Sequence, residues 1–236
     1  MRAMILAAGK GTRLGSMTAE LPKPMLPLGD RPVLAWTLER LAASGINEVI
    51  INLHHAPTAI PQFFGDGSTW GVQITYSPEP EILGTAGGVK HAQKLLGNET
   101  FLVVYGDNVF DWDPSHMLAV HHAQAAFATI AVAEVADASR SGLVAFDAEG
   151  RISRFVEKPG PLPDPRGWVN AGVYVLDHAI FDHIPVAQFC DFGFDVFPRL
   201  LDGGLRLQAF QLASAPLAID TPDSYEAAQS RWADRG

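Results

Sequence analysis

The hydrophobic residues follow one pattern in the first half of the chain and another in the second half. In the first half, short runs that are almost continuously apolar alternate with stretches of helical periodicity. Such runs are typical of central strands in a parallel sheet that helices cover on both faces. We expect strands over Met4–Ala8, Glu48–Leu53, Val72–Ser77 and Phe101–Tyr105, and helices over Val33–Ser44, Thr58–Phe64 and Gly87–Leu95.

After about residue 125, strand patterns follow one another with few helices between them. Ala148–Gly150 has the composition of a hairpin turn, and four prolines in residues 159–167 predict an exposed loop. We expect strands over Ala128–Val135, Gly142–Asp147, Ile152–Glu157, Val169–Leu176 and Leu205–Leu212, and helices over Phe194–Leu201 and Ser224–Ala233.

These elements predict an α/β fold. Repeated strand–helix–strand units imply right-handed crossovers and a Rossmann-like, doubly wound sheet, mixed but mostly parallel and flanked by helices. The sequence contains no repeat, low-complexity tract or linker. We therefore expect a single domain over residues 1–236 with two functional halves that divide near residue 125.

Composition excludes several classes of protein. The formal net charge of −9 argues against nucleic acid as a partner, although a few cations suffice to hold a nucleotide. No apolar run approaches the roughly 20 residues that span a bilayer, so we expect no membrane partner. The one cysteine, Cys190, excludes an internal disulfide and a cysteine zinc site, and we expect a cytoplasmic protein.

A glycine-rich segment, Leu6-Ala7-Ala8-Gly9-Lys10-Gly11-Thr12-Arg13-Leu14, follows the first strand. Glycines let the backbone approach phosphate oxygens, and the Arg13 guanidinium can hold a phosphate through two hydrogen bonds. The spacing matches neither the P-loop nor the dinucleotide fingerprint. Alone, the segment fits a plain strand–helix turn equally well.

Lys23 follows this segment, between Pro22 and Pro24. Prolines restrict the backbone, so the sequence predicts a lysine held in one place rather than a solvated surface charge. A lysine held beside a phosphate loop favours an anionic ligand.

These residues resemble a known family, the sugar-1-phosphate nucleotidylyltransferases. Its signature, G-x-G-T-R-L followed by P-K-P-[ML]-x-P, is present here, and further segments similar to the family follow in order along the chain. The similar segments are Leu83–Gly87, Tyr105–Asp107, Phe155–Pro159, Asn170–Tyr174, Asp195–Leu200 and Ile219–Tyr225.

The resemblance implies a GT-A-like fold with a nucleotide-binding half and a sugar-phosphate-binding half. It implies that Arg13 and Lys23 are catalytic and that Asp107 and Asp220 bind Mg²⁺. The sugar phosphate would be bound by Glu157, Lys158, Asn170 and Gly172. The nucleotide would be bound by Leu6, Ala7, Ala8, Gly9, Gly11, Thr12, Gly84, Thr85, Gly87 and Gly106.

The residues themselves leave alternatives open. Asp107 ends an apolar strand, where ligands bind in open α/β sheets, but a buried structural aspartate is the other reading. Asp220 stands in I-D-T-P where the family often has D-x-G-T-P, although related cytidylyltransferases have I-D-T-P. Lys158 fits a surface salt bridge with Glu157, and Asn170 fits the cap of a turn. The histidine pairs at 54–55 and 121–122 fit packing better than metal binding, because adjacent side chains point apart.

The implied reaction joins a nucleoside triphosphate and a sugar 1-phosphate into a nucleotide sugar, with release of pyrophosphate. The segments Gly84–Gly87 and Glu157–Pro159 resemble those of mannose- and heptose-1-phosphate guanylyltransferases, which implies GTP with mannose 1-phosphate or heptose 1-phosphate. Transfer of uridylyl or thymidylyl groups, including the muramate-1-phosphate type, stays open. Two other classes are a regulator that binds without turnover and an oxidoreductase. The oxidoreductase needs an acidic residue on the second strand, which instead ends in Asn52-Leu53-His54. An oligomer of identical chains also stays open.

Overall fold

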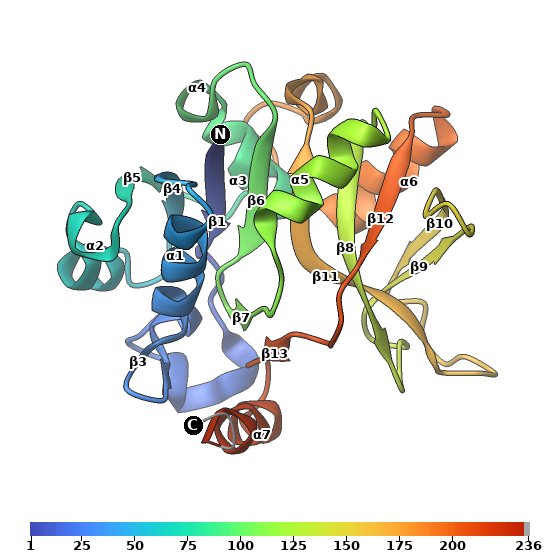
Figure 1. The fold of residues 1–236 in the computed structure, drawn as a ribbon. Coiled ribbons are helices and arrows are strands. Elements are labelled where there is room, and N and C mark those ends of the chain that lie inside the picture. Colours follow the sequence, from blue (N-terminus) through green and yellow to red (C-terminus); the bar gives the residue numbers. More distant parts are fainter. Residues whose placement is uncertain (234–236) are drawn as a thin grey trace. The chain divides into compact units, whose positions relative to one another are not determined.

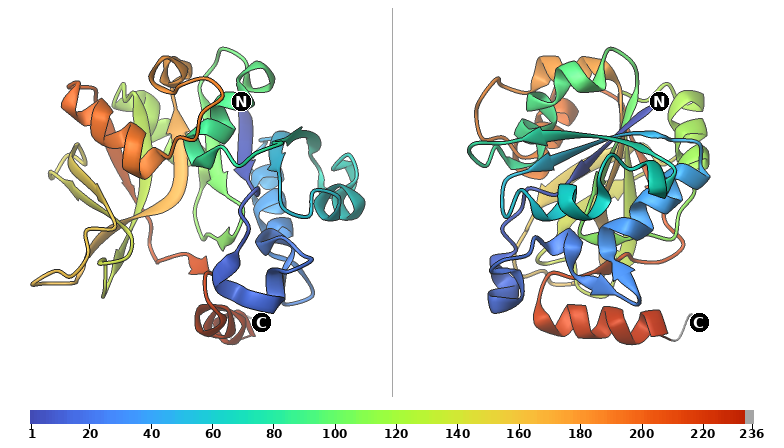
Figure 2. Two further views of the ribbon diagram at one scale, coloured as in Figure 1. Left: turned by 180° about the vertical axis from the view of Figure 1, so that it is seen from behind. Right: turned by 90° about the vertical axis from the view of Figure 1, so that its left-hand side faces the viewer.

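A computed structural model describes residues 1–233, which form two compact units (Figures 1 and 2). Among the described residues, the first unit comprises Met1–Ile82, Val104–Phe110 and residues 216–233, and the second comprises Leu83–Val103 and Asp111–Ala215. The chain therefore passes four times between the units, after residues 82, 103, 110 and 215, whereas the predicted halves divide once, near residue 125. The prediction of a single domain with two functional halves stays a prediction.

The first unit is built on parallel strands. Strand β1 pairs with β4, and β4 pairs with β5, both in parallel, with Ile5 opposite Ile51 and Ile51 opposite Tyr76. Both isoleucines are fully buried. The strands of this unit are β1 (Arg2–Leu6), β2 (Pro27–Leu28), β3 (Arg31–Pro32), β4 (Glu48–Leu53), β5 (Gln73–Pro78), β7 (Asn108–Val109) and β13 (Leu217–Ala218).

Helices of the first unit enclose a second apolar cluster. Its helices are α1 (Val33–Ala43), α2 (Ala59–Phe64) and α7 (Pro222–Ala233), with the short 3-10 helices η1 (Thr12–Thr18), η2 (Lys23–Met25) and η3 (Ser68–Trp70). Tyr225 of α7 is buried in this cluster, and its hydroxyl donates to the Pro27 carbonyl at 2.6 Å. The Trp36 and Trp232 rings lie 4.4 Å apart. These contacts fix the start of α7, and with it the preceding residue Asp220.

The second unit has a mixed sheet. Strand β8 (Ala128–Val135) pairs antiparallel with β11 (Gly167–Leu176) and parallel with β12 (Leu207–Gln211), while β9 (Gly142–Phe146) and β10 (Ile152–Glu157) form a hairpin. Strand β6 (Phe101–Tyr105) begins in this unit and ends in the first. The helices are α3 (Gly84–His91), α4 (Gln93–Leu96), α5 (Pro114–Ala123), η4 (His178–His183), the π-helical turn η5 (Phe192–Val196) and α6 (Phe197–Asp202).

Aromatic side chains fill the core of the second unit beneath α6. The Phe192 and Phe197 rings are stacked 5.3 Å apart, and Tyr174 from β11 meets both edge to face. All three side chains are fully buried. This packing fixes η5 against the sheet and so positions the segment just before it, residues 188–191.

The α/β prediction, with a mixed sheet and flanking helices, is confirmed, and most predicted elements are found within one to three residues of their expected ends. The first strand ends at Leu6 rather than Ala8, because the Ala7 N–H donates to the side chain of Asn52 instead of a neighbouring strand. The helix predicted over residues 87–95 is wrong as one element. It begins at Gly84 and is interrupted at Ala92, giving α3 and α4.

The sequence did not predict helix α5. Its buried residues include His121 and Met117, and its apolar periodicity is weak because histidines and alanines occupy most of the other positions. The short paired strands β7 and β13 were also not predicted, since each has only two residues.

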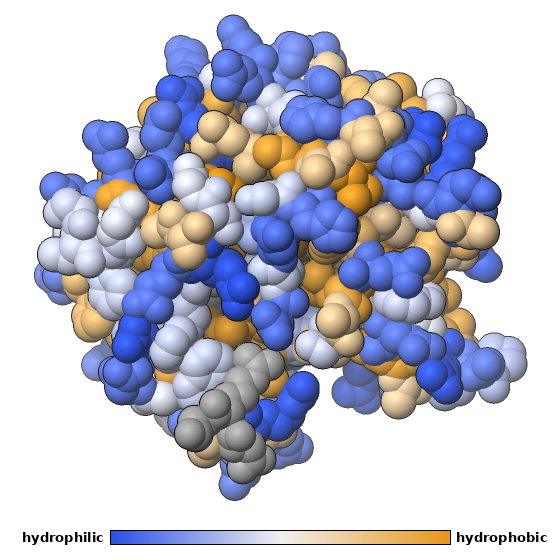
Figure 3. Space-filling view, in the orientation of Figure 1, coloured by the Kyte–Doolittle hydropathy of each residue, from blue (hydrophilic) through white to orange (hydrophobic). Residues whose placement is uncertain are grey.

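The surface is mixed in character. Charged and polar residues cover much of the face shown in Figure 3, with apolar residues in small groups between them. Within residues 1–233, every helix is too short or too polar to cross a membrane.

Buried His121 tests the packing of α5. Its ring is 3% exposed, and its Nδ1 lies 3.0 Å from the Thr129 hydroxyl on β8. Burial, with a smaller contribution from His122, lowers the pKa of His121 from 6.5 to about 4. The folded protein therefore favours the neutral ring. The resulting stability is fully present above the unfolded-state pKa of 6.5 and is lost as the pH falls through the folded-state value.

We predict that His121 alone lowers the free energy of unfolding by roughly 2–3 kcal/mol between pH 6.5 and pH 4. Urea unfolding at a series of pH values measures this. His121→Gln should have a flatter pH dependence in this window, whereas His122→Gln, at the exposed neighbour, should nearly retain the wild-type slope. Equal slopes for wild type and His121→Gln would contradict the assignment.

Candidate functional site

The glycine loop of the first unit presents an open backbone surface. Gly9 is exposed, and a Cβ built on it would meet no atom within 4 Å. Gly11 is different: its φ is 63°, and a Cβ there would lie 2.8 Å from Cγ of Lys23. Gly11 is thus required for the lysine stem to pass close beneath the loop, while Gly9 leaves room for a ligand.

Lys23 joins two carboxylates. Its Nζ donates to Oδ2 of Asp107 at 2.9 Å and to Oδ1 of Asp220 at 2.5 Å. Asp107 follows Gly106 just beyond β6, and Asp220 lies between β13 and α7. The lysine side chain is 10% exposed, against 25% for Asp107 and 40% for Asp220. The fold therefore brings three of the predicted site residues, Lys23, Asp107 and Asp220, into direct contact.

The two carboxylates determine the protonation state of Lys23. Burial alone would lower the pKa of Lys23, but the adjacent Asp107 and Asp220 outweigh it, and the pKa of Lys23 is raised above its usual value. The lysine is therefore a permanent cation at neutral pH. Arg13 adds a second positive charge, since its guanidinium donates to Oδ1 of Asp220 at 2.9 Å.

The other predicted nucleotide residues of this unit adjoin the cluster through the backbone. The Gly106 N–H donates to the Leu6 carbonyl at 3.0 Å, and a Cβ on Gly106 would lie 2.9 Å from Ile5. Ala7 and Ala8 are buried, and Thr12 is exposed at the start of η1. The glycine at 106 therefore allows the strand end that carries Asp107 to lie against the end of β1.

In the second unit, the start of α3 is held by residues 190–192. The N–H groups of Ala86 and Gly87 both donate to the Cys190 carbonyl at 3.0 Å. The Thr85 hydroxyl donates to Asp191 at 2.9 Å and accepts from the Phe192 N–H. The backbone groups of this segment are thus largely used within the unit, and the nucleotide-binding roles of Gly84, Thr85 and Gly87 stay predictions.

Glu157 and Lys158 lie at the end of β10. The Glu157 carboxylate packs on glycine: a Cβ built on Gly142 would lie 2.6 Å from its Oε2. Burial, then the charge of Asp191, raises the pKa of Glu157, while Lys158 opposes the shift. Lys158 is exposed, with φ of 49° and its Nζ 5.3 Å from the centre of the Phe194 ring. Neither residue forms the Glu157–Lys158 salt bridge that was the alternative reading.

Asn170 and Gly172 lie where the pairing of β11 with β8 changes register. The Asn170 amide donates to the Tyr174 hydroxyl at 2.8 Å, and its Oδ1 accepts from the Gly172 N–H at 3.0 Å. The φ of Gly172 is 81°. The geometry agrees with the turn-capping alternative for Asn170, and its role toward a sugar stays a prediction.

The histidine pairs have structural partners. His54 lies 2.9 Å from the Glu79 carbonyl, and His55 lies 2.7 Å from the Thr18 carbonyl. In the described chain, no three His, Cys, Asp or Glu side chains are grouped to hold a metal ion on their own. A metal ion held at Asp107 and Asp220 would therefore have no third ligand from a His, Cys, Asp or Glu side chain of the described residues.

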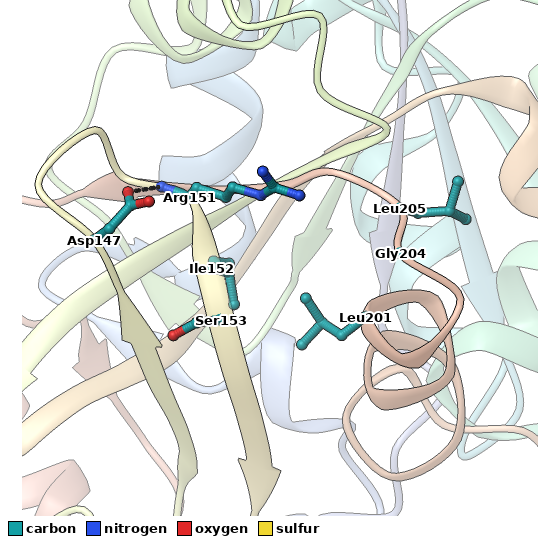
Figure 4. A pocket seen from close by; sticks show the side chains of 7 residues that line it. All are labelled: Asp147, Arg151, Ile152, Ser153, Leu201, Gly204 and Leu205. Atoms are coloured by element: carbon teal, nitrogen blue, oxygen red, sulfur yellow. Dashed lines mark hydrogen bonds between the residues drawn. The ribbon is translucent and has the colours of Figure 1, made fainter.

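A separate pocket of about 280 Å³ lies in the second unit, where Ile152 and Ser153 of β10 face Leu201 of α6 (Figure 4). The Arg151 N–H donates to Asp147 at its rim at 2.7 Å. None of the predicted site residues lines this pocket.

The family of the chain follows from a comparison of its sequence with known families. The nucleotidyl transferase family profile matches residues 2–236. The chain belongs to the nucleotidyl transferase family. This confirms the resemblance drawn from the motifs and excludes the oxidoreductase alternative.

Individual relatives in the nucleotidyl transferase family differ in substrate. A UTP–glucose-1-phosphate uridylyltransferase of Synechocystis is 38% identical over 90% of this chain and 58% of its own length. A mannose-1-phosphate guanylyltransferase of Mycobacterium tuberculosis is 37% identical over 94% of this chain and 62% of its own. The chain thus spans about three fifths of the length of these curated relatives.

A solved structure supports the fold. A Bacillus anthracis protein in complex with sucrose matches 99% of this chain and 96% of its own with a TM-score of 0.89, at 24% identity. At this identity the likeness concerns the fold alone. It agrees with the predicted arrangement of a mixed, mostly parallel sheet between helices.

The motifs did not reveal Asn52, which orients the glycine loop of this nucleotidyl transferase. Its Oδ1 accepts from the Ala7 N–H at 2.7 Å, and its Nδ2 donates to Glu79 at 2.7 Å. Asn52 and Glu79 are 2% and 4% exposed. The sequence did contain a signal for Asn52, because it is a polar residue within the apolar run of β4. A buried amide requires hydrogen-bond partners, so such a residue is expected to hold a neighbouring segment.

We predict that Asn52→Ala lowers the free energy of unfolding by about 2–3 kcal/mol, because it leaves the Ala7 N–H and the Glu79 carboxylate without this partner. Urea unfolding measures the effect. Asn47→Ala, at an exposed amide of the same unit, should change stability by less than about 0.5 kcal/mol. Equal stability of the two variants would contradict this role.

Proposed function

We propose that the chain transfers a nucleotidyl group from a nucleoside triphosphate to a sugar 1-phosphate. The observation that carries the proposal is the convergence of Arg13, Lys23, Asp107 and Asp220 beside an open glycine loop. Two cations and an accessible backbone suit a polyphosphate. Membership of the nucleotidyl transferase family supports the same reaction.

In the proposed reaction, a phosphate oxygen of the sugar 1-phosphate attacks the α-phosphorus of the triphosphate. The bond from that phosphorus to the bridging oxygen breaks, and pyrophosphate leaves in line with the electron pair. The attacking oxygen is ionised at neutral pH, so no residue has to act as a general base. The work of the protein is to position two anions and to neutralise charge.

Each unit has a part in this proposal. Arg13 steadies the β- and γ-phosphates and then the pyrophosphate, while Lys23 neutralises the α-phosphate. Lys158 binds the phosphate of the sugar 1-phosphate, and Glu157 accepts hydrogen bonds from sugar hydroxyls. The exposed position of Lys158 and the partial burial of Glu157 support these roles.

Asp107 and Asp220 suit a divalent cation, for which we propose Mg²⁺. Each already brings one oxygen within 2.9 Å of the same ammonium, so the two carboxylates converge on a point that a small cation could occupy. Oxygen-only ligands fit a hard ion of this kind. When bound, it would neutralise charge on the phosphates.

For the substrates, we propose GTP with mannose 1-phosphate or heptose 1-phosphate. Mannose-1-phosphate guanylyltransferases recur among the relatives, from Mycobacterium tuberculosis, Arabidopsis thaliana and Schizosaccharomyces pombe. The Synechocystis uridylyltransferase, with nearly the same identity, makes UTP with glucose 1-phosphate the second candidate.

A substrate matrix tests the proposal. GTP, UTP, dTTP, ATP and CTP are each paired with mannose, heptose, glucose and muramate 1-phosphates, and pyrophosphate release is measured with Mg²⁺ present. We expect the highest kcat/KM for GTP with mannose or heptose 1-phosphate. Release that occurs only with UTP or dTTP would overturn the choice of base, and binding without release in every pair would favour a regulator.

Asp107→Asn should lower kcat by at least about 100-fold while leaving the thermal unfolding temperature within a few degrees of wild type. The change keeps the size of the side chain but removes the charge that holds the cation. Asp182→Asn, which removes one exposed charge elsewhere, is the matched control and should have wild-type kcat. Near-normal turnover in Asp107→Asn would contradict the metal-binding role.

Lys158→Ala should raise the KM for the sugar 1-phosphate by about tenfold or more and change the KM for the triphosphate by much less, because one charged contact to phosphate is lost. Initial rates with each substrate varied in turn measure the two constants. Lys94→Ala removes an exposed lysine of α4 and should change neither. An equal effect on both constants would argue against binding of the sugar phosphate by Lys158.

A further inference from the structure

We infer that Lys23 is an internal counter-ion that keeps the Asp107–Asp220 pair from binding a divalent cation until the triphosphate arrives. The inference rests on the proposed function and concerns the order in which the site is filled. Its consequence is that the free enzyme has low affinity for divalent cations, whereas the enzyme with bound triphosphate has high affinity.

The first support is the position of the ammonium. The Nζ of Lys23 contacts one oxygen of each carboxylate, at 2.9 Å and 2.5 Å. A cation that bridges the two carboxylates at this point would need those same oxygens. Because Mg²⁺ binds oxygen at 2.0–2.1 Å, it and the ammonium could not both bridge the pair.

The second support is the balance of charge. Two carboxylates face one ammonium and one guanidinium, since Arg13 also contacts Oδ1 of Asp220. The formal charge of the cluster is therefore zero, and a divalent cation entering alone would meet two fixed positive charges. A triphosphate brings the negative charge that Lys23 and Arg13 can bind in place of the carboxylates.

The third support is the number of protein ligands. No third His, Cys, Asp or Glu in residues 1–233 completes a metal site at these two carboxylates. Mg²⁺ takes six oxygen ligands and is commonly held by one or two carboxylates together with substrate phosphates. The triphosphate can therefore supply ligands that the two carboxylates leave open, with water in the remaining positions.

The fourth support is the anchoring of the lysine. The Leu26 N–H donates to the Lys23 carbonyl at 3.0 Å, and the lysine stem lies directly beneath Gly11. The backbone and stem are thus fixed, and the ammonium can change partner only by rotation about the last bonds of the side chain. Such a rotation keeps Lys23 beside the glycine loop, where phosphates would bind.

The test is the affinity of the nucleotide-free protein for Mn²⁺, measured by electron paramagnetic resonance of the unbound ion. Lys23→Met keeps the length of the side chain without its charge, and we expect it to bind Mn²⁺ about tenfold or more tightly than wild type. Lys23→Arg keeps the charge and should bind as weakly as wild type. Addition of GTP should raise the Mn²⁺ affinity of wild type far more than that of Lys23→Met.

Two controls locate the effect. Lys10→Met removes an exposed lysine of the same loop that has no ion-pair partner in the described chain, and it should leave Mn²⁺ affinity at the wild-type value. Adding Asp107→Asn to Lys23→Met should abolish the gain, which shows that the ion is held by this carboxylate pair. Circular dichroism of each variant checks that the fold is intact.

Equal or weaker Mn²⁺ binding by folded Lys23→Met would overturn the inference, as would an equal gain in Lys10→Met. Failure of the proposed function would give a different result: the wild type would release no pyrophosphate in the substrate matrix. The Mn²⁺ measurement requires no turnover, so the two failures are distinguishable.

Discussion

The ammonium of Lys23 joins segments of the first unit that are far apart in the sequence. It contacts Asp107 and Asp220 with its side chain largely buried, so removal of the lysine would leave both carboxylates without this counter-ion. The surrounding structure is arranged for this contact. Gly11 admits the stem of the lysine, Gly106 brings the end of β6 against β1, and the packing of Tyr225 fixes the chain just after Asp220.

In the second unit, a set of hydrogen bonds joins the start of α3 to residues 190–192 and holds the two segments together. The Cys190 carbonyl accepts from two N–H groups of the helix, and Asp191 accepts from the Thr85 hydroxyl. Gly87 is needed here because a Cβ would lie 2.7 Å from the Gln188 carbonyl. The glycines of this segment thus have a packing role within the unit as well as the ligand role that the resemblance implies.

Local patterns predicted most strands and helices, and the central strands β4 and β6 were found because their apolar runs are almost continuous. The patterns failed where tertiary contacts decide the ends: Asn52 ends β1 by taking the Ala7 N–H, and α5 is buried through a histidine. For the site, the motifs named Arg13, Lys23, Asp107 and Asp220, but the sequence could not show that one ammonium holds both carboxylates. That contact depends on folding across about 200 residues, from Lys23 to Asp220. The amide of Asn170 bonds within its own turn, a contact that the motif did not reveal, and its role toward a sugar stays a prediction.

In the proposed site, Asp107 and Asp220 hold a metal ion jointly with the phosphates of a bound triphosphate. Pulsed electron paramagnetic resonance of Mn²⁺ with GTP and the protein tests this joint coordination most directly. We expect phosphorus hyperfine coupling to protein-bound Mn²⁺ in the wild type, and loss of the protein-bound signal in both Asp107→Asn and Asp220→Asn. An unchanged Mn²⁺–GTP complex on either folded variant would contradict joint coordination by the two carboxylates.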